Sequence, residues 1–196
     1  MSDKKEKYYM SIGHPIGLCT NDKNEKFFNV EVNGDFVGLF NEDYLIWKYC
    51  FFDVKERDDI ILYFVSQHIM SDFNVGIELD RLISNKCLVC LEDLSSINDT
   101  FDILKDYRPQ RNGFGTGLIN DNANELAMYR ILNQSQSFDV ITEDFTIWSL
   151  SNGKNTVEDI CDKMQKDYLL ANKEAKSVII NGILRLKTLD LLRINI

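Results

Sequence analysis

An internal repeat constrains the fold of this chain more than any other feature of its sequence. The segment Asn41–Cys50 reads NEDYLIWKYC, and about a hundred residues later Thr142–Ser151 reads TEDFTIWSLS. The acidic pair, the aromatic residue, the isoleucine and the tryptophan occupy the same places in both segments. Two further matches keep the same order along the chain: Gly17-Leu18 with Gly117-Leu118, and Asn24-Glu25 with Asn124-Glu125. We therefore interpret the chain as two copies of one module.

The repeat divides the 196 residues into four parts. An N-terminal tail (1–11) precedes a first module (12–91), and a polar linker (92–112) leads to a second module (113–196). The linker holds Pro109, one of only two prolines in the chain. Each module is long enough for a small domain with a core of its own.

Turn and capping patterns predict the same order of elements in both modules. In the first module, the strands FFNVEV and DFVGLF flank Asn33-Gly34. This pair is typical of a two-residue hairpin, because both central residues of its turn need a positive φ. In the second module, we expect Thr142 to cap one helix, and Thr156 with Asp159 resembles a capping box for the next. The pattern predicts an α+β fold of two tandem winged helix-turn-helix modules, each a three-stranded antiparallel sheet plus three helices.

Composition and charge limit the class of protein. Hydrophobic residues make up 44% of the chain, which supports packed cores, and the net charge of −9 opposes binding to nucleic acid. No apolar run approaches the ~20 residues of a membrane span, and no apolar segment typical of a secretory signal follows the charged N-terminus. Five scattered cysteines suit a reducing compartment. We expect a cytoplasmic protein without membrane contact.

No motif of an enzyme is found in the sequence. There is no glycine loop that could hold a phosphate and no G-x-S-x-G segment, and the two histidines lack matched partners. Cys87 and Cys90 have CxxC spacing, but no second pair completes a tetrahedral metal site, so we interpret them as core cysteines. Trp47 and Trp148, at helical spacing behind an isoleucine, are interpreted as core anchors. We therefore expect no catalysis, no metal and no cofactor.

The segment Glu143–Met164, EDFTIWSLSNGKNTVEDICDKM, resembles the signature of PqqD-like domains, the RiPP recognition elements. In that family a three-stranded sheet is followed by a fixed order of residues. The order is an acidic and an aromatic residue, Ile/Val-Trp, a Leu, a turn made of a small residue and Gly, and Thr-Val-x-x-Ile. The matching positions are Phe145, Ile147, Trp148, Leu150, Gly153, Thr156, Val157 and Ile160. The first module keeps Tyr44, Ile46 and Trp47, but FFDVKERDD then replaces the turn, so its resemblance to the family is weaker.

The resemblance implies a non-catalytic adaptor that binds the leader of a ribosomally made precursor peptide and presents it to modifying enzymes. In the family, the leader adds as an antiparallel strand to the edge of the third β-strand. Its side chains enter a groove between that strand and the third helix. A stand-alone chain of this kind is similar to the leader-binding scaffold proteins of azole-forming thiopeptide (micrococcin-like) pathways. That similarity implies cyclodehydratase and dehydrogenase partners, and it leaves open whether the protein is a homodimer.

Two segments of the second module suit such a groove. The third strand would offer an open edge, and the third helix has a second face on which Ile180 and Leu184 are surrounded by lysines. The expected peptide-binding residues are Ser137, Phe138, Asp139, Val140, Ile141, Thr142, Lys173, Lys176, Ser177, Ile180, Leu184 and Lys187. The matching edge of the first module offers the alternative set Phe36, Val37, Leu39 and Phe40.

Three alternatives stay open on the sequence alone. In the first alternative, the second face of the third helix packs against the first module or a partner protein instead of lining a groove. A winged helix can also bind DNA as a transcriptional regulator, although the net charge and the acidic third helix of the first module, with Glu78 and Asp80, oppose this. Finally, the chain would be a purely structural subunit if the two modules bury each other's edges.

Overall fold

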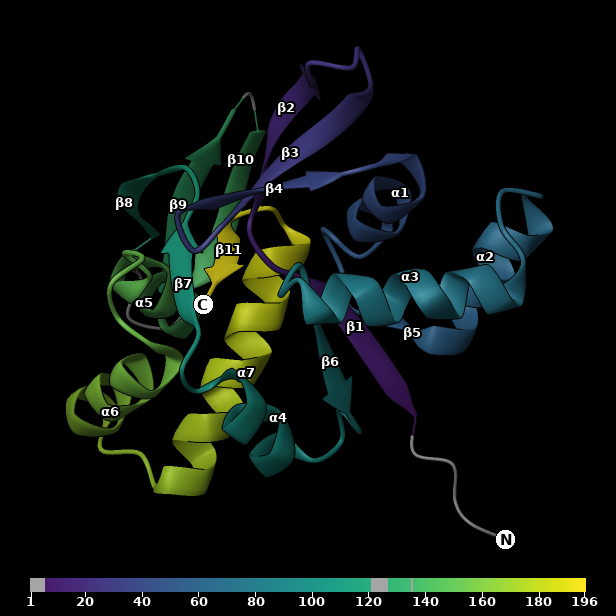
Figure 1. The fold of residues 1–196 in the computed structure, drawn as a ribbon. Helices are drawn as coiled ribbons and strands as arrows, with labels where there is room; N and C mark the ends of the chain where they lie inside the picture. The colour runs from purple at the N-terminus through teal and green to yellow at the C-terminus, as the bar shows by residue number, and fades with distance from the viewer. Residues whose placement is uncertain (1–5, 121–126, 135) are drawn as a thin grey trace, which may run out of the picture. The chain divides into compact units, whose positions relative to one another are not determined.

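A computed structural model describes residues 6–120, 127–134 and 136–196, and over these residues the chain has a mixed α+β fold with seven helices and small antiparallel sheets (Figure 1). The chain divides into two compact units, Met1–Ser96 (unit 1) and Ile97–Asn195 (unit 2). The boundary between the units falls inside the segment 92–112 that the sequence indicated as a linker. No helix in the described ranges is long and apolar enough to cross a membrane.

Unit 1 combines two three-stranded antiparallel sheets with three helices. Its strands are β1 (Lys7–Ser11), β2 (His14–Thr20), β3 (Lys26–Val32), β4 (Asp35–Leu39), β5 (Lys55–Glu56) and β6 (Leu88–Glu92). Its helices are α1 (Asn41–Tyr49), α2 (Arg57–Ser66) and α3 (Asp72–Ser84). The strand orders are β2-β3-β4 and β5-β1-β6. The expected three strands and three helices are therefore present, together with a second sheet that the sequence did not reveal.

After one additional helix, the described residues of unit 2 follow the order of unit 1, except that no strand corresponds to β5. Its strands are β7 (Arg108–Arg111), β8 (Phe114–Asn120), β9 (Met128–Asn133), β10 (Gln136–Ile141) and β11 (Leu192–Asn195). Its helices are α4 (Ile97–Leu104), α5 (Thr142–Leu150), α6 (Val157–Tyr168) and α7 (Asn172–Thr188). The strand orders are β10-β9-β8 and β11-β7.

The repeated residues make the same contacts in both units. The indole nitrogen of Trp47 donates to the Ile12 carbonyl at 3.0 Å, and that of Trp148 donates to the Asn112 carbonyl at 3.1 Å. The other matched contacts are the stacked rings Phe28–Tyr44 and Tyr129–Phe145 and the ion pairs Asp43–Arg81 and Asp144–Arg185. The two tryptophans are 1% and 4% exposed, which confirms the prediction that they anchor the core.

Ordered elements lie where the sequence indicated a tail and a linker. Within residues 1–11, Lys7–Ser11 forms β1, which lies between β5 and β6 in its sheet and buries Tyr9 and Met10. Residues 1–5 of that tail, and the Asn124-Glu125 half of one repeat match, lie outside the described residues. Within residues 92–112, the chain forms α4 and β7. Because β1 and β7 pair with strands far along the chain, local patterns did not reveal them.

Two of the predicted local motifs are present and one is not. Asn33 and Gly34 have φ values of 56° and 85°, as the hairpin turn requires. The Thr156 hydroxyl accepts from the Asp159 N–H at 3.1 Å, and the Asp159 carboxylate accepts from the Thr156 N–H at 2.9 Å, which completes the capping box. The hydrogen bond from the Thr156 N–H to the carboxylate, followed by that from the Thr156 side chain, lowers the pKa of the Asp159 carboxyl group. Thr142 does not cap α5: its hydroxyl donates to the Ala127 carbonyl at 3.3 Å.

Candidate functional site

The sheet β10-β9-β8 of unit 2 is fixed to α5 by an aromatic stack. The ring of Tyr129 on β9 lies 4.4 Å from that of Phe145, which in turn stacks on Trp148 at 5.6 Å. Ile131 on β9 and Val140 on β10 are 0% and 4% exposed. One face of the sheet therefore belongs to the core, and this packing holds β10 in a fixed position.

Strand β10 is a regular edge strand. It pairs with β9 without a register shift from Gln136↔Asn133 to Ile141↔Met128, and none of the strands in the described residues pairs with its outer side. The opposite edge strand, β8, is irregular, with a register shift between Gly115 and Gly117. A regular open edge is a template for another strand, whereas a bulge disrupts such pairing. The edge suited to a further strand is therefore β10.

The register of the hairpin shows which backbone groups of β10 point outward. Asn133 and Gln136 form the last pair of the ladder and stand three positions apart in the sequence, the spacing at which two paired residues exchange hydrogen bonds. Pairs that exchange hydrogen bonds alternate along an antiparallel ladder with pairs that do not. The N–H groups of Ser137, Asp139 and Ile141 consequently point to the open side. Ser137 and Asp139 are exposed, whereas Phe138, Ile141 and Thr142 are half-buried. The strand half of the predicted site is thus brought together along one accessible edge.

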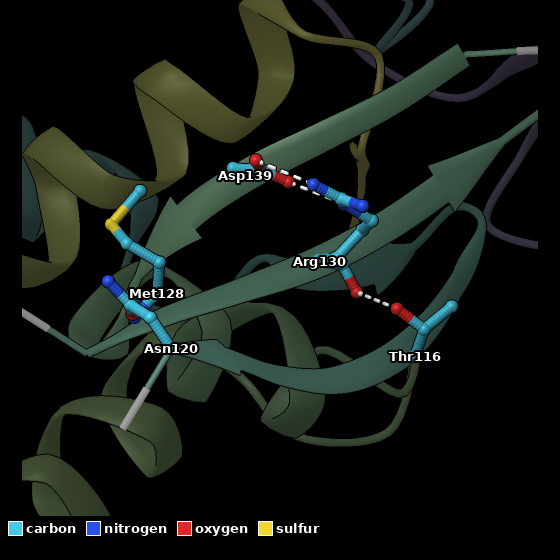
Figure 2. Close-up of polar contacts among 5 residues, drawn as sticks. All are labelled: Thr116, Asn120, Met128, Arg130 and Asp139. Carbon is cyan, nitrogen blue, oxygen red and sulfur yellow. Dashed lines mark hydrogen bonds and ion pairs between the residues drawn. The ribbon is translucent and has the colours of Figure 1, made fainter. Parts of the chain in front are cut away.

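An ion pair across the outer face of the sheet joins β10 to β9 (Figure 2). Arg130 donates to Asp139 in a bidentate pair, from Nε to Oδ1 at 2.8 Å and from Nη2 to Oδ2 at 2.9 Å. These hydrogen bonds lower the pKa of the Asp139 carboxyl group. On β8, Thr116 donates to the Arg130 carbonyl at 3.3 Å, and Asn120 accepts from the Met128 N–H at 3.0 Å. The three strands are cross-linked without using the outward N–H groups of β10.

The helical side of the predicted groove is partly packed. Ile180 and Lys187, expected on a free face of α7, are 1% and 4% exposed. Helix α4 packs against α7, and Nζ of Lys176 lies 4.5 Å from the centroid of the Phe101 ring on α4. Of the remaining predicted residues, Lys173 is exposed, and Ser177 and Leu184 are half-buried. The packing of α4 on α7 was not among the alternatives that the sequence left open, because α4 lies in a segment that was interpreted as a linker.

The alternative edge in unit 1 has the same geometry. Strand β4 pairs with β3 from Val32↔Asp35 to Phe28↔Leu39 and lies at the edge of its sheet. Of the four residues named for this edge, Phe36 and Phe40 are 67% and 47% exposed, Val37 is half-buried, and Leu39 is 1% exposed and belongs to the core. By the same alternation, the N–H groups of Phe36, Gly38 and Phe40 point outward.

The exposed face of the β10-β9-β8 sheet carries apolar residues that the sequence did not single out. Phe114 on β8 lies opposite Leu132 on β9, and these side chains are 80% and 39% exposed. Arg130 and Leu132 alternate with the core residues Tyr129 and Ile131, so the period of a half-buried strand could have identified them. Together with the Arg130–Asp139 pair they form an outer face that is partly apolar and partly charged.

The CxxC segment has the features of core residues. Cys87 is fully buried, and burial raises the pKa of its thiol to about 11, so the thiol stays protonated at neutral pH. Cys90 lies half-buried on β6, and burial raises its pKa as well. All five cysteines are free thiols. In residues 6–120, 127–134 and 136–196, no three His, Cys, Asp or Glu side chains gather in a way that could hold a metal ion.

No protein-family model matches the chain, and no curated protein matches its sequence. Two similar solved structures are PKMT2 from Rickettsia typhi, with a TM-score of 0.38 and 12% identity, and PKMT2 from Rickettsia typhi in complex with AdoHcy, with a TM-score of 0.40 and 14% identity. Each match covers 95% of this chain and 42% of the PKMT2 chain. The chain therefore spans less than half the length of the protein that it matches.

These matches contradict the prediction of a non-catalytic adaptor and the prediction that the chain is not an enzyme. The similar structures are of PKMT2, in one case in complex with AdoHcy. The predictions rested on the absence of local catalytic motifs. Such motifs identify only those active sites whose residues stand close together in the sequence, so their absence did not justify the conclusion.

Proposed function

We propose that the chain binds an extended polypeptide segment, which adds as a strand to the outer edge of β10. The observation that carries this proposal is the regular, unpaired edge of β10, whose other face is fixed to the core of unit 2. Strand addition satisfies outward N–H and C=O groups with main-chain hydrogen bonds. The proposal concerns binding, and the presenting role of a non-catalytic adaptor is not part of it.

In this proposal each unit is a winged-helix module. The sheets β2-β3-β4 and β8-β9-β10 are the wings, and the helices α1–α3 and α5–α7 form the two helical parts. The support is the shared order of elements and the matched contacts of the two units. The resemblance of Glu143–Met164 to PqqD-like domains agrees with this arrangement. It would make the bound segment the leader of a precursor peptide, and cyclodehydratase and dehydrogenase enzymes the further partners.

Main-chain hydrogen bonds alone would give weak binding. Each contributes a net of about 0.5–1.5 kcal/mol, whereas micromolar affinity corresponds to about 8 kcal/mol after the cost of association. Side chains of the bound strand must therefore contribute. Because they alternate between the two faces of the sheet, one set would lie beside the half-buried Phe138 and the other beside Ser137 and Asp139. A segment with alternating apolar and polar residues fits this edge best.

A proline substitution tests strand addition at the backbone. Peptides would first be selected against the full chain from a displayed library, labelled with a fluorophore and titrated by anisotropy. Ser137→Pro removes an outward N–H without removing a bond to β9, so we expect affinity to fall by about tenfold or more while the far-ultraviolet circular dichroism stays unchanged. Ser137→Ala keeps the N–H group and is the matched control.

The corresponding substitution in unit 1 identifies the unit that binds. Phe36→Pro removes an outward N–H from β4, and we expect it to leave affinity unchanged. Loss of binding in Phe36→Pro but not in Ser137→Pro would move the site to unit 1. Wild-type affinity in both proline variants would show that strand addition is wrong.

A further inference from the structure

Unit 1 exposes large apolar side chains on α2 and α3. Ile60 and Phe64 of helix α2 lie in the core, where they are 0% and 1% exposed. The other sides of α2 also carry apolar residues. The exposed residues of the two helices include Leu62 at 68%, Val65 at 40%, Phe73 at 76% and Ile77 at 47%. Contiguous apolar surface of this kind commonly marks an interaction site.

Two neighbouring hollows connect these side chains. One is lined by Arg57, Asp58, Ile61, Leu62, Val65 and Asp72, and the other by Arg57, Asp72, Phe73, Gly76, Ile77 and Asp80. Arg57 and Asp72 line both hollows, which are therefore neighbours, and we call the two hollows together the α2–α3 groove. All of its lining residues belong to unit 1.

The fold does not require this apolar surface, since unit 2 has the same elements without it. Helix α6 occupies the place of α2 in the element order and buries a single stripe, formed by Val157, Ile160, Cys161 and Met164. Its remaining exposed positions are mostly charged, as in Glu158, Asp162, Lys163, Lys166 and Asp167. The apolar exterior of α2 is therefore specific to unit 1 and calls for a reason other than folding.

The charges around the groove indicate what could cover it. Asp58, Asp72 and Asp80 face a single cation, Arg57, whose Nη1 lies 4.0 Å from Asp58 Oδ1. The lining of the groove thus combines apolar side chains with three acidic groups and one basic group. Such a lining repels acidic peptides and anionic lipid surfaces and favours a partner that carries Lys or Arg beside its apolar residues.

We propose that the α2–α3 groove of unit 1 binds a basic amphipathic helix of a partner protein. Its apolar face would cover Leu62, Val65 and Phe73, and its Lys or Arg side chains would lie beside Asp58, Asp72 and Asp80. This surface shares no residue with β10 or β4, so it is independent of the strand-addition site.

Two designed peptides test the chemistry of the partner. The probe is a fluorescent amphipathic Leu/Lys helix of about 18 residues, and its twin carries Glu in place of every Lys. With the full chain, we expect the Lys peptide to bind about tenfold or more tightly than the Glu peptide, with an affinity that falls as salt is added. Equal binding of the two peptides would overturn the proposal.

Substitutions in the groove test its location. The double variant Leu62→Ser/Phe73→Ser changes exposed side chains only, so it should fold normally and lose about tenfold or more in affinity for the Lys peptide. Asp80→Asn should weaken binding of the Lys peptide and leave binding of the Glu peptide unchanged. The matched control is Phe114→Ser in unit 2, which also removes an exposed phenylalanine and should bind as the wild type does. Undiminished binding by the double variant would overturn the proposal.

A second copy of the chain is the competing occupant of the groove. Light scattering after size-exclusion chromatography would report it as a dimer of the wild type that the double variant does not form. A dimer of this kind, together with no binding of the Lys peptide, would overturn the proposal in favour of self-association.

Discussion

At the scale of single residues, the matched aspartates Asp43 and Asp144 differ in their surroundings. Asp144 accepts two hydrogen bonds from Arg185, at 3.0 and 2.6 Å. In unit 1, Arg81 contacts both Asp43 and Glu78. A hydrogen bond to Asp43, followed by burial and the charge of Asp43, raises the pKa of Glu78 from 4.5 to about 7. Glu78 therefore keeps its proton up to near neutral pH in the folded protein.

This proton on Glu78 makes the stability of unit 1 depend on pH. Between pH 4.5 and about 7, the folded state holds a proton on Glu78 that the unfolded chain has lost. The contribution of this group is thus fully present below pH 4.5 and is lost as the pH rises through about 7. Glu78→Gln can keep a hydrogen bond to Asp43 without titrating. From about pH 5 to about pH 8, we expect the melting temperature of the wild type to fall more than that of Glu78→Gln.

Thermal unfolding of both proteins at several pH values measures this difference. Glu158→Gln, which alters an exposed carboxylate on α6, is the control and should follow the wild type. Parallel curves for the wild type and Glu78→Gln would show that folding does not raise the pKa of Glu78.

At the scale of elements, the packing of α5 on α7 depends on a glycine. Gly182 lies within α7, where glycine ordinarily weakens a helix. A Cβ atom at this position would overlap Cδ1 of Ile147 and lie 3.1 Å from Oδ1 of Asp144. Gly182 stands three residues before Arg185, as Glu78 stands three residues before Arg81. The glycine thus lets α5 approach α7 closely. It also means that no carboxylate corresponding to Glu78 stands at this position beside Asp144 and Arg185.

Two glycine substitutions with opposite expected effects test this packing. Gly182→Ala should lower the free energy of unfolding by about 1–3 kcal/mol, because the added methyl overpacks the contact with Ile147. Gly76→Ala in α3 should raise it by about 0.5–1 kcal/mol, because its Cβ would meet only Nη2 of Arg57, at 3.6 Å. Urea denaturation measures both values. A stabilised Gly182→Ala variant would contradict the close approach of the two helices.

Local elements could be predicted from the sequence where neighbouring residues determine them. Asn33-Gly34 and the Thr156–Asp159 capping box act within four residues, and both are present. Strand β1 could not be predicted in this way, because its partner β6 lies far along the chain. For the site, the resemblance to PqqD-like domains indicated the edge strand β10. The packing of α4 against α7 was not predicted, because the apolar Phe101 and Leu104 of α4 stand in a segment that is polar overall.

At the scale of the whole molecule, each unit contains the strand partners that it needs. Strands β1, β5 and β6 pair within unit 1, and β7 and β11 pair within unit 2. The Asp144–Arg185 ion pair and the packing of α4 on α7 also lie within unit 2. We therefore expect the fragment 97–196 to fold alone, with a single cooperative transition by circular dichroism. A fragment without a cooperative transition would contradict the independence of the units.

Strand addition to β10 is tested most directly by amide hydrogen exchange, measured residue by residue with nuclear magnetic resonance. The exchange rates of the full chain would be compared with and without a saturating selected peptide. The amides of Ser137, Asp139 and Ile141 point outward, so we expect them to exchange fast in the free protein and slowly in the complex. If the peptide binds and these three amides keep the rates of the free protein, the polypeptide does not pair with β10.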